Sequence, residues 1–140
     1  MNTKPMIVIL LILFVQLLAA CGSPVTEIPP TPTLTPDPGK IVQDFWDAVN
    51  RKDFDSAMAL VADDIECTGT LTERGKELFR IAIEAGNKQE GTKYEINNLV
   101  VSGDTVTYDW AAYRNNAVQA RGKGESMVVK DGKIVQCFTT

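Results

Sequence analysis

The sequence contains no histidine, and this absence excludes several kinds of chemistry. Ser-His-Asp and Cys-His nucleophiles, and zinc sites with imidazole ligands, all require it. Histidine is also the side chain that ordinarily titrates near neutral pH. Acid–base catalysis would therefore depend on a carboxylate, lysine, tyrosine or cysteine, and we expect no metal and no cofactor.

Positive charge is scarce as well. The 140 residues carry 14 Lys and Arg against 18 Asp and Glu, for a net charge of −4, and the basic residues are scattered. Such an anionic surface repels phosphate backbones, so nucleic acid is not an expected partner. The composition, 44% hydrophobic and 23% charged, is ordinary for a folded domain, and the length allows one.

Residues 1–20 have the organisation of a secretory signal peptide. Lys4 makes the start basic, and an apolar run of about 15 residues begins at Met6. A helix needs ~20 apolar residues to cross a bilayer. We therefore predict a cleaved signal peptide rather than a transmembrane anchor.

The end of this leader, Leu18-Ala19-Ala20-Cys21, resembles the lipobox of bacterial lipoproteins. The resemblance implies cleavage before Cys21 and acylation of its thiol, with palmitate among the acyl chains. Several acyl chains hold a protein firmly, because each buried methylene contributes ~0.8 kcal/mol. We therefore expect a lipid-anchored protein on the extracytoplasmic face of the cell membrane or the outer membrane.

Residues 21–39 form a proline- and threonine-rich segment. Proline at this density prevents helix and sheet and favours extended polyproline II. We interpret the segment as a spacer between the lipid and a domain over residues 40–140. Its prolines are Pro24, Pro29, Pro30, Pro32, Pro36 and Pro38.

Two helices are predicted at the start of that domain. Asp37 and Asp53 are good N-cap residues, and Pro38 suits the first position of a helix. Apolar residues then recur with helical spacing after each cap. They are Val42, Phe45, Trp46 and Val49 in the first helix and Phe54, Ala57, Met58 and Val61 in the second.

A short strand, Ile65–Thr68, and a third helix follow in this interpretation. Thr70 and Glu73 match a capping box, and Gly86 is a plausible helix end. The apolar residues of this helix are Leu78, Phe79, Ala82 and Ile83.

The rest of the chain predicts four strands joined by tight turns. The strands are Thr92–Ser102, Thr105–Arg114, Ala117–Lys130 and Lys133–Thr139. The turns are Gly103-Asp104, Asn115-Asn116 and Asp131-Gly132. Helices followed by a meander indicate an α+β fold, with three N-terminal helices packed on a curved antiparallel sheet.

Two-residue turns also predict a register. They place Arg121 opposite Trp110, Lys123 opposite Tyr108 and Glu125 opposite Val106, on the face that the helices cover. The same face would carry Leu99, Val101, Met127, Val129, Ile134 and Phe138. The glycines of Gly122-Lys123-Gly124 indicate a bulge or bend in this strand.

The order of elements resembles the nuclear-transport-factor-2-like superfamily, in particular SnoaL-like domains and ketosteroid isomerases. The resemblance covers about residues 41–140 and implies a cone-shaped, cystatin-like α+β barrel. It is carried by the segments 45–55, 59–64 and 128–135, the last matching the family's final hairpin.

The catalytic residues of the isomerases match this chain poorly. Their oxyanion-stabilising tyrosine falls at Phe45 and their base aspartate near Gly69. Glu125 alone lies about where the family places an acid in the pocket. It is a candidate general base, but pairing of Glu125 with Arg121 or Lys123 is the interpretation we favour, because perturbed carboxylates are often structural.

The candidate pocket-lining residues are Tyr108, Trp110, Arg121 and Glu125, although aromatic side chains on an inner strand face often serve only for packing.

Cys67 and Cys137 remain once Cys21 is lipidated. Outside the cytoplasm they could form a disulfide, which the resemblance favours by placing their strands together. The predicted register points Cys137 away from the helices, so we expect two buried thiols.

These observations predict a membrane-anchored domain that binds a small apolar molecule or an envelope protein, without catalysis. One alternative is a cyclase- or isomerase-type enzyme that uses Glu125 as its base. Another is a structural module that forms homodimers through the outer sheet face around Val100, Ala111 and Tyr113. A hollow interior would favour ligand binding or catalysis, and a filled one the structural module.

Overall fold

A computed structural model describes residues 36–69 and 72–139 of the chain. All of them belong to one compact unit, Leu34–Thr140. The predicted signal peptide, Cys21 and the tether up to residue 35 lie outside the described residues. In the part of the chain that is described, no helix is long and apolar enough to cross a membrane.

The first two helices form as the sequence predicts. Helix α2 spans Pro38–Asn50 and begins at Asp37, whose side chain accepts a hydrogen bond from the Gly39 amide at 2.9 Å. Helix α3 spans Phe54–Ala59 and begins at Asp53, which accepts from the Ser56 amide at 3.2 Å. The predicted apolar side chains are buried or partly buried, but Val61 does not belong to the second helix as predicted: it begins strand β1, Val61–Gly69.

Helix α4, Lys76–Gly86, starts later than the capping box predicts. Its N-cap is Gly75, because the residues before it pair with strand β1: the Cys67 amide donates to the Glu73 carbonyl at 2.8 Å and the Gly75 amide to the Ile65 carbonyl at 2.7 Å. Thr70 lies outside the described residues. Of the apolar residues predicted for this helix, Phe79 and Ile83 are buried and Leu78 is exposed.

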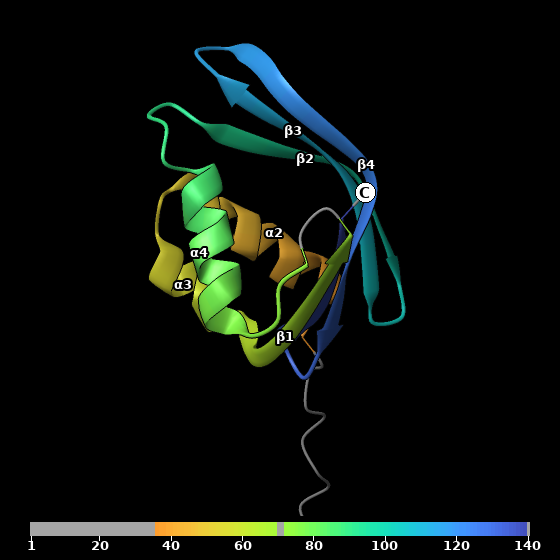
Figure 1. Cartoon of the computed structure of the whole chain (residues 1–140). Helices are drawn as coiled ribbons and strands as arrows, with labels where there is room; N and C mark the ends of the chain where they lie inside the picture. The colour runs from red at the N-terminus through yellow and green to blue at the C-terminus, as the bar shows by residue number, and fades with distance from the viewer. Residues whose placement is uncertain (1–35, 70–71, 140) are drawn as a thin grey trace, which may run out of the picture. The chain divides into compact units, whose positions relative to one another are not determined.

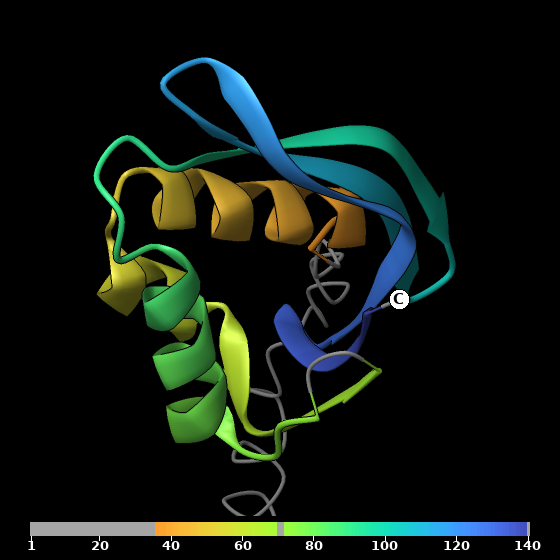
Figure 2. The same ribbon diagram turned by 45° about the horizontal axis from the view of Figure 1, so that its top comes forward.

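Five strands form one sheet in the order β1-β5-β4-β3-β2. Strands β2 to β5 match the prediction to within one residue, whereas β1 is longer than predicted and pairs in parallel with β5, so the sheet is not wholly antiparallel. The strands are β1 Val61–Gly69, β2 Lys93–Ser102, β3 Thr105–Arg114, β4 Ala117–Lys130 and β5 Lys133–Thr139. The sheet curves around the helices, which lie on its concave side (Figures 1 and 2).

Bulges in β4 correct the predicted register. The Asn115-Asn116 turn pairs Arg114 with Ala117 as expected, but a register shift between Ala112 and Tyr113 then places Arg121 opposite Ala111, not Trp110. A second shift, between Tyr108 and Trp110, places Glu125 opposite Tyr108 instead of Val106. The predicted bulge around Gly122 and Gly124 is confirmed, and Gly124 has a φ of +67°, which favours glycine.

A carboxylate on β3 holds this bend together. Asp109 accepts a hydrogen bond from the Gly124 amide of β4 at 2.9 Å and another from the Asn98 side chain of β2 at 2.8 Å. Asn98 has a φ of +52° and lies where the β2–β3 register also shifts. Irregularities in β2 and β4 thus meet at one side chain of the strand between them, and the sheet bends there.

A further irregularity between β4 and β5 changes the orientation of Cys137. Val129 pairs with Ile134 but Val128 pairs with Gln136, so one extra residue enters β5. Ile134 and Cys137 are both buried as a result, whereas Phe138 is exposed, contrary to the predicted face. Cys67 and Cys137 are register partners, with Cα atoms 4.5 Å apart, and form a disulfide. The expectation of two free thiols is therefore wrong.

Candidate functional site

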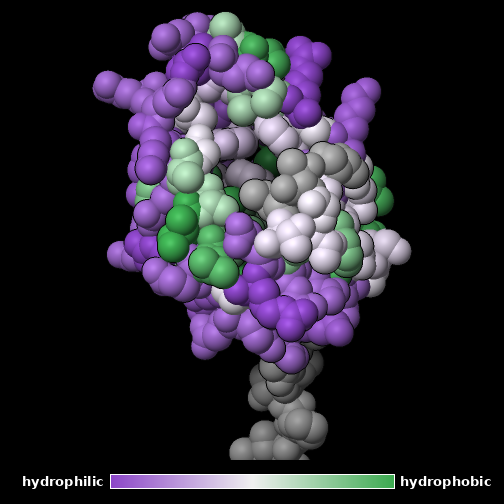
Figure 3. Space-filling model, viewed as in Figure 1, coloured by the Kyte–Doolittle hydropathy of each residue, from purple (hydrophilic) through white to green (hydrophobic). Residues whose placement is uncertain are grey.

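The interior of the domain contains a cavity of about 270 Å³ between helices α2 and α4 and the bent sheet. Figure 3 shows a hollow with apolar atoms at its base between the helices and the sheet. Most of the side chains that line the cavity are aromatic or aliphatic. The lining residues are Trp46, Phe79, Ala82, Ile83, Gly86, Asn87, Tyr94, Tyr108, Trp110, Glu125, Met127, Cys137 and Thr139.

Four of these rings, from three different elements, surround the cavity. Trp46 of α2 lies 5.2 Å from Tyr94 and 6.2 Å from Tyr108, centroid to centroid, and Tyr94 lies 5.9 Å from Trp110. The corresponding interplanar angles are 35°, 72° and 51°. The rings are therefore inclined to one another, so they form the walls of a box and not a single stack.

Both indole N–H groups in this box are buried donors without an acceptor among the described residues. Trp46 Nε1 and Trp110 Nε1 are both shielded from solvent. A buried polar group without a partner costs about 1–3 kcal/mol. A ligand with an acceptor atom in the cavity would recover that cost.

The Tyr108 hydroxyl remains protonated under physiological conditions. Burial raises the pKa of Tyr108 far above its ordinary value, and the nearby Glu125 carboxylate raises it further. The Trp46 indole opposes this increase in part, although it makes no hydrogen bond within the described part of the chain. Tyr108 can therefore donate a hydrogen bond in the cavity but is a poor acid.

Glu125 is the buried carboxylate of the cavity, with 6% of its surface exposed. Its position depends on Gly122, which pairs with Trp110 across the bulge. A Cβ atom at Gly122 would lie 2.7 Å from Glu125 Oε1 and closer still to Trp110 Nε1. Because Gly122 has no side chain, the Trp110 ring and the Glu125 carboxylate can both approach the β4 backbone.

Polar contacts fix the other end of the cavity, near the end of α4. The Asn50 side chain makes a reciprocal pair of hydrogen bonds with the Tyr94 backbone, at 2.7 and 2.8 Å. The buried Asn87 side chain donates to the Ile83 carbonyl and accepts from Lys52 Nζ, both at 2.8 Å. Burial lowers the pKa of Lys52. These contacts join strand β2, through Tyr94, and the end of α4, through Asn87, to the C-terminal end of α2.

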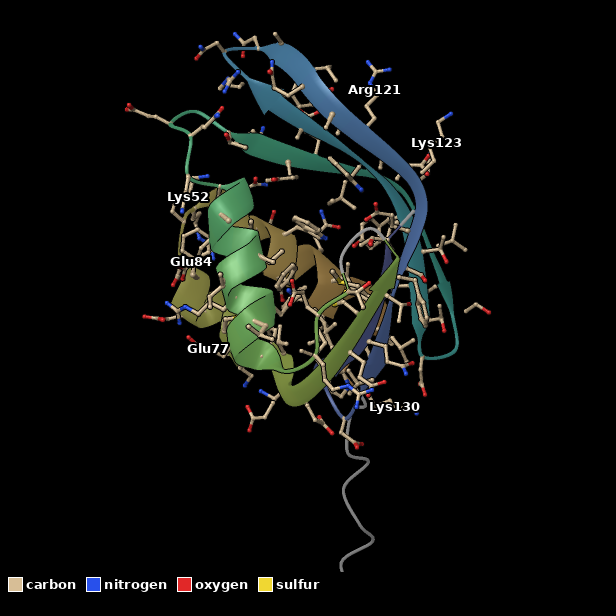
Figure 4. All side chains as sticks on the ribbon, in the orientation of Figure 1. Lys52, Glu77, Glu84, Arg121, Lys123 and Lys130 are labelled. Carbon is tan, nitrogen blue, oxygen red and sulfur yellow. A yellow bond between two sulfur atoms is a disulfide. The ribbon has the colours of Figure 1, made fainter. Side chains whose placement is uncertain are left out.

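The structure brings together three of the four predicted pocket residues. Tyr108, Trp110 and Glu125 line the cavity, but Arg121 does not: the bulges turn it to the exposed face, and Figure 4 shows Arg121 and Lys123 pointing from β4 away from the helices. Sequence reasoning placed Trp46 in the core and did not single out Tyr94. The sequence signal that could have indicated a role for Trp46 in the site is its polar N–H group, which lies on an otherwise apolar helix face.

The isomerase positions that matched poorly in sequence have structural roles here. Phe45 is fully buried and stacks on Phe79 at 5.9 Å. Gly69 pairs with Thr139 at the end of the β1–β5 ladder, with a φ of +108°. Neither Phe45 nor Gly69 is among the described residues that line the cavity.

A model of the SnoaL-like domain matches residues 42–137. The chain belongs to the SnoaL-like domain family. No curated protein matches it. Among solved structures, an NTF2-like protein from Cytophaga hutchinsonii is 19% identical, with a TM-score of 0.61, covering 74% of this chain and 88% of that one.

Two further solved structures are similar. A protein with a cystatin-like fold from Methylobium petroleophilum is 18% identical, with a TM-score of 0.63, covering 74% of each chain. An LEH-like epoxide hydrolase from M. tuberculosis is 20% identical, with a TM-score of 0.56, covering 74% of this chain and 82% of that one. At these identities the likeness shows the α+β fold, and the activity must be argued from the site.

Proposed function

We propose that this chain is a lipid-anchored extracytoplasmic protein whose SnoaL-like domain binds a small, largely apolar molecule and does not transform it. The observation that carries the binding role is the cavity of about 270 Å³ with its wall of aromatic rings. Ligand sites are typically concave and apolar with a few polar groups that orient the ligand. The two indole N–H groups and Glu125 are such groups.

The binding role can be tested with a neutral fluorescent probe such as N-phenylnaphthylamine. We expect saturable binding that is lost in Ala82→Leu, because Ala82 lines the cavity and a larger side chain would occupy it. Ala85→Leu is the matched control, since Ala85 is an exposed residue of the same helix. Equal binding by both variants would show that the probe does not occupy the cavity, and the proposal would fail.

The anchor rests on the sequence Leu18-Ala19-Ala20-Cys21 and on the tether behind it. Mass spectrometry of the mature N-terminus tests it. We expect a chain that begins at Cys21 and carries acyl groups, recovered in the membrane fraction. An unmodified Cys21, or an intact Met1 in cells, would contradict this part of the proposal and leave the cavity argument untouched.

An enzyme is the second candidate, and the burial of Glu125 beside the Trp110 indole favours it. A carboxylate in such surroundings can serve as a general base. Similar solved structures include proteins assigned as a ketosteroid isomerase and a polyketide cyclase. Turnover of a ketosteroid or polyketide-like substrate that Glu125→Gln abolishes would support this candidate over simple binding.

A structural dimerisation module receives less support. That alternative required a filled interior, whereas the cavity is hollow. Its surface also lacks one of the expected residues, since Ala111 is buried while Val100 is exposed. Measuring the mass in solution of wild type and Val100→Asp would test whether the outer sheet face forms a homodimer all the same.

A further inference from the structure

The cavity combines aromatic walls with the negative charge of Glu125. Among the described residues that line it, Glu125 is the only one with a formally charged side chain, and Tyr108 is held neutral by its burial. Lys52 is bound to Asn87 and the Thr92 carbonyl, and Arg121 and Lys123 point outward (Figure 4).

From this arrangement, and resting on the proposed function, we propose that the ligand is a methylated ammonium compound that also carries a neutral oxygen acceptor. Aromatic faces attract cations through the quadrupole of the ring, and a box of several rings is the usual way to bind a quaternary ammonium. Trp46, Tyr94, Tyr108 and Trp110 supply such faces at different inclinations. Glu125 supplies the opposite charge.

The side chains that line the cavity favour a methylated ammonium over a primary ammonium. A primary ammonium brings three N–H donors that need acceptors when they are buried. Glu125 can accept from such an ammonium, but Asn87 Oδ1 already accepts from Lys52 and most of the remaining wall is apolar, so the cavity has too few acceptors for all three donors. Methyl groups need no acceptors, and they bury apolar surface against the rings.

The oxygen acceptor follows from the two indole donors. Trp46 Nε1 and Trp110 Nε1 have no hydrogen-bond partner within the described residues, and a cation alone would leave them so. A hydroxyl, ether or carbonyl oxygen a few bonds from the nitrogen would accept from one of them. A carboxylate on the ligand is disfavoured, because Glu125 would repel it.

Choline and its neutral carbon isostere, dimethylbutanol, provide the decisive comparison on the wild-type protein. The two have the same shape and the same hydroxyl and differ in charge. The chain has two tryptophans, Trp46 and Trp110, and both line the cavity, so intrinsic fluorescence reports on it directly. We expect choline to bind at least about tenfold more tightly than the alcohol. Equal affinity would overturn the proposal.

Two changes to the protein locate the effect. Glu125→Gln should sharply reduce the preference for choline while leaving the weak binding of the alcohol, and Glu77→Gln should have no effect, because Glu77 lies on the exposed side of α4 (Figure 4). Replacing both tryptophans by fluorotryptophan lowers the electron density of the rings without changing the fold. Choline affinity should then fall by about tenfold, with the alcohol unaffected.

The outcomes separate this inference from the function on which it rests. If N-phenylnaphthylamine binds in a manner that Ala82→Leu abolishes, but choline shows no preference over the alcohol, the cavity is a binding site for neutral ligands and the cation proposal is wrong. If the preference for choline is unchanged by both Glu125→Gln and fluorination, the cation binds elsewhere and the proposal is again wrong. If neither probe binds, both proposals fail.

Discussion

Two regions of the interior differ in how completely they are packed. The packed region consists of fully buried aliphatic residues, whereas the cavity region keeps a void and two donors without acceptors. The packed region is formed by Val61, Ile65, Val106 and Ile134, and the cavity region by Trp46, Tyr94, Tyr108, Trp110 and Glu125. One strand, β3, contributes to both, so the difference lies in side-chain choice and in bulges, not in separate elements.

This contrast indicates that stability and ligand binding depend on different residues of the interior. Close packing and satisfied hydrogen bonds are the rule in folded proteins, and departures from it concentrate at sites that bind something else. The packed region should therefore determine the free energy of unfolding and the cavity region the affinity for ligands. The disulfide lies on the boundary, since Cys137 belongs to the core cluster and also lines the cavity.

Removing the disulfide should have the largest effect. It joins β1 to β5 across a sequence separation of 70 residues. Constraining a loop of that length in the unfolded chain is worth about 4 kcal/mol. We expect the Cys67→Ala/Cys137→Ala protein to lose about that much in urea unfolding. A midpoint equal to that of the oxidised wild type would show that the sheet edge is held by its hydrogen bonds alone.

Truncations in the two regions come next and test the comparison directly. Ile134→Ala should cost about 3 kcal/mol of unfolding free energy, because it opens a cavity among fully buried neighbours. Met127→Ala enlarges a void that already exists, so its cost should be nearer the lower limit of about 2 kcal/mol. Probe affinity should change only for Met127→Ala. If Ile134→Ala were the variant that altered probe binding, the two regions would not be separable.

Substitutions of two glycines in the β4 bulge distinguish an effect on ligand binding from an effect on stability. Gly122→Ala should displace Trp110 and Glu125, lowering probe affinity severalfold, with a stability cost of about 1 kcal/mol. At Gly124 nothing lies within 4 Å of the added Cβ, and its φ of +67° makes any side chain strained. Gly124→Ala should therefore cost a similar free energy and leave binding unchanged. Titrations with N-phenylnaphthylamine alongside urea unfolding separate the two effects.

The sequence predicts the parts of this fold that depend on local signals. The caps at Asp37 and Asp53 and the turns at Asn115-Asn116 and Asp131-Gly132 need only neighbouring residues, and all are confirmed. Gly122-Lys123-Gly124 also predicted a bulge, because glycine is a local signal too.

The sequence-based prediction is wrong for residues that follow a bulge, either in their face of the sheet or in their pairing partner. One extra residue in β5 reverses the face of Cys137, and the shifts in β4 turn Arg121 outward and bring Glu125 opposite Tyr108. A period-2 pattern does not reveal an inserted residue, since every later side chain moves to the other face together. The cavity could not be predicted either. Trp46 has the spacing of a core residue, and that spacing predicts burial but does not show that the space beside the ring is empty.

The smallest predicted effect concerns Asp109, which accepts hydrogen bonds from the irregular segments of both neighbouring strands. The hydrogen bond from Asn98, then that from the Gly124 amide, and the charge of Lys123 lower the pKa of Asp109 below its ordinary value of 3.8. A carboxyl whose pKa is lower in the folded state contributes stability above its unfolded pKa and loses it as the pH falls through the folded value. Unfolding midpoints should therefore decline below about pH 4 more steeply for wild type than for Asp109→Asn. Asp47→Asn, at an exposed position of α2, is the control, and parallel curves for wild type and Asp109→Asn would mean that this carboxylate does not hold the bend.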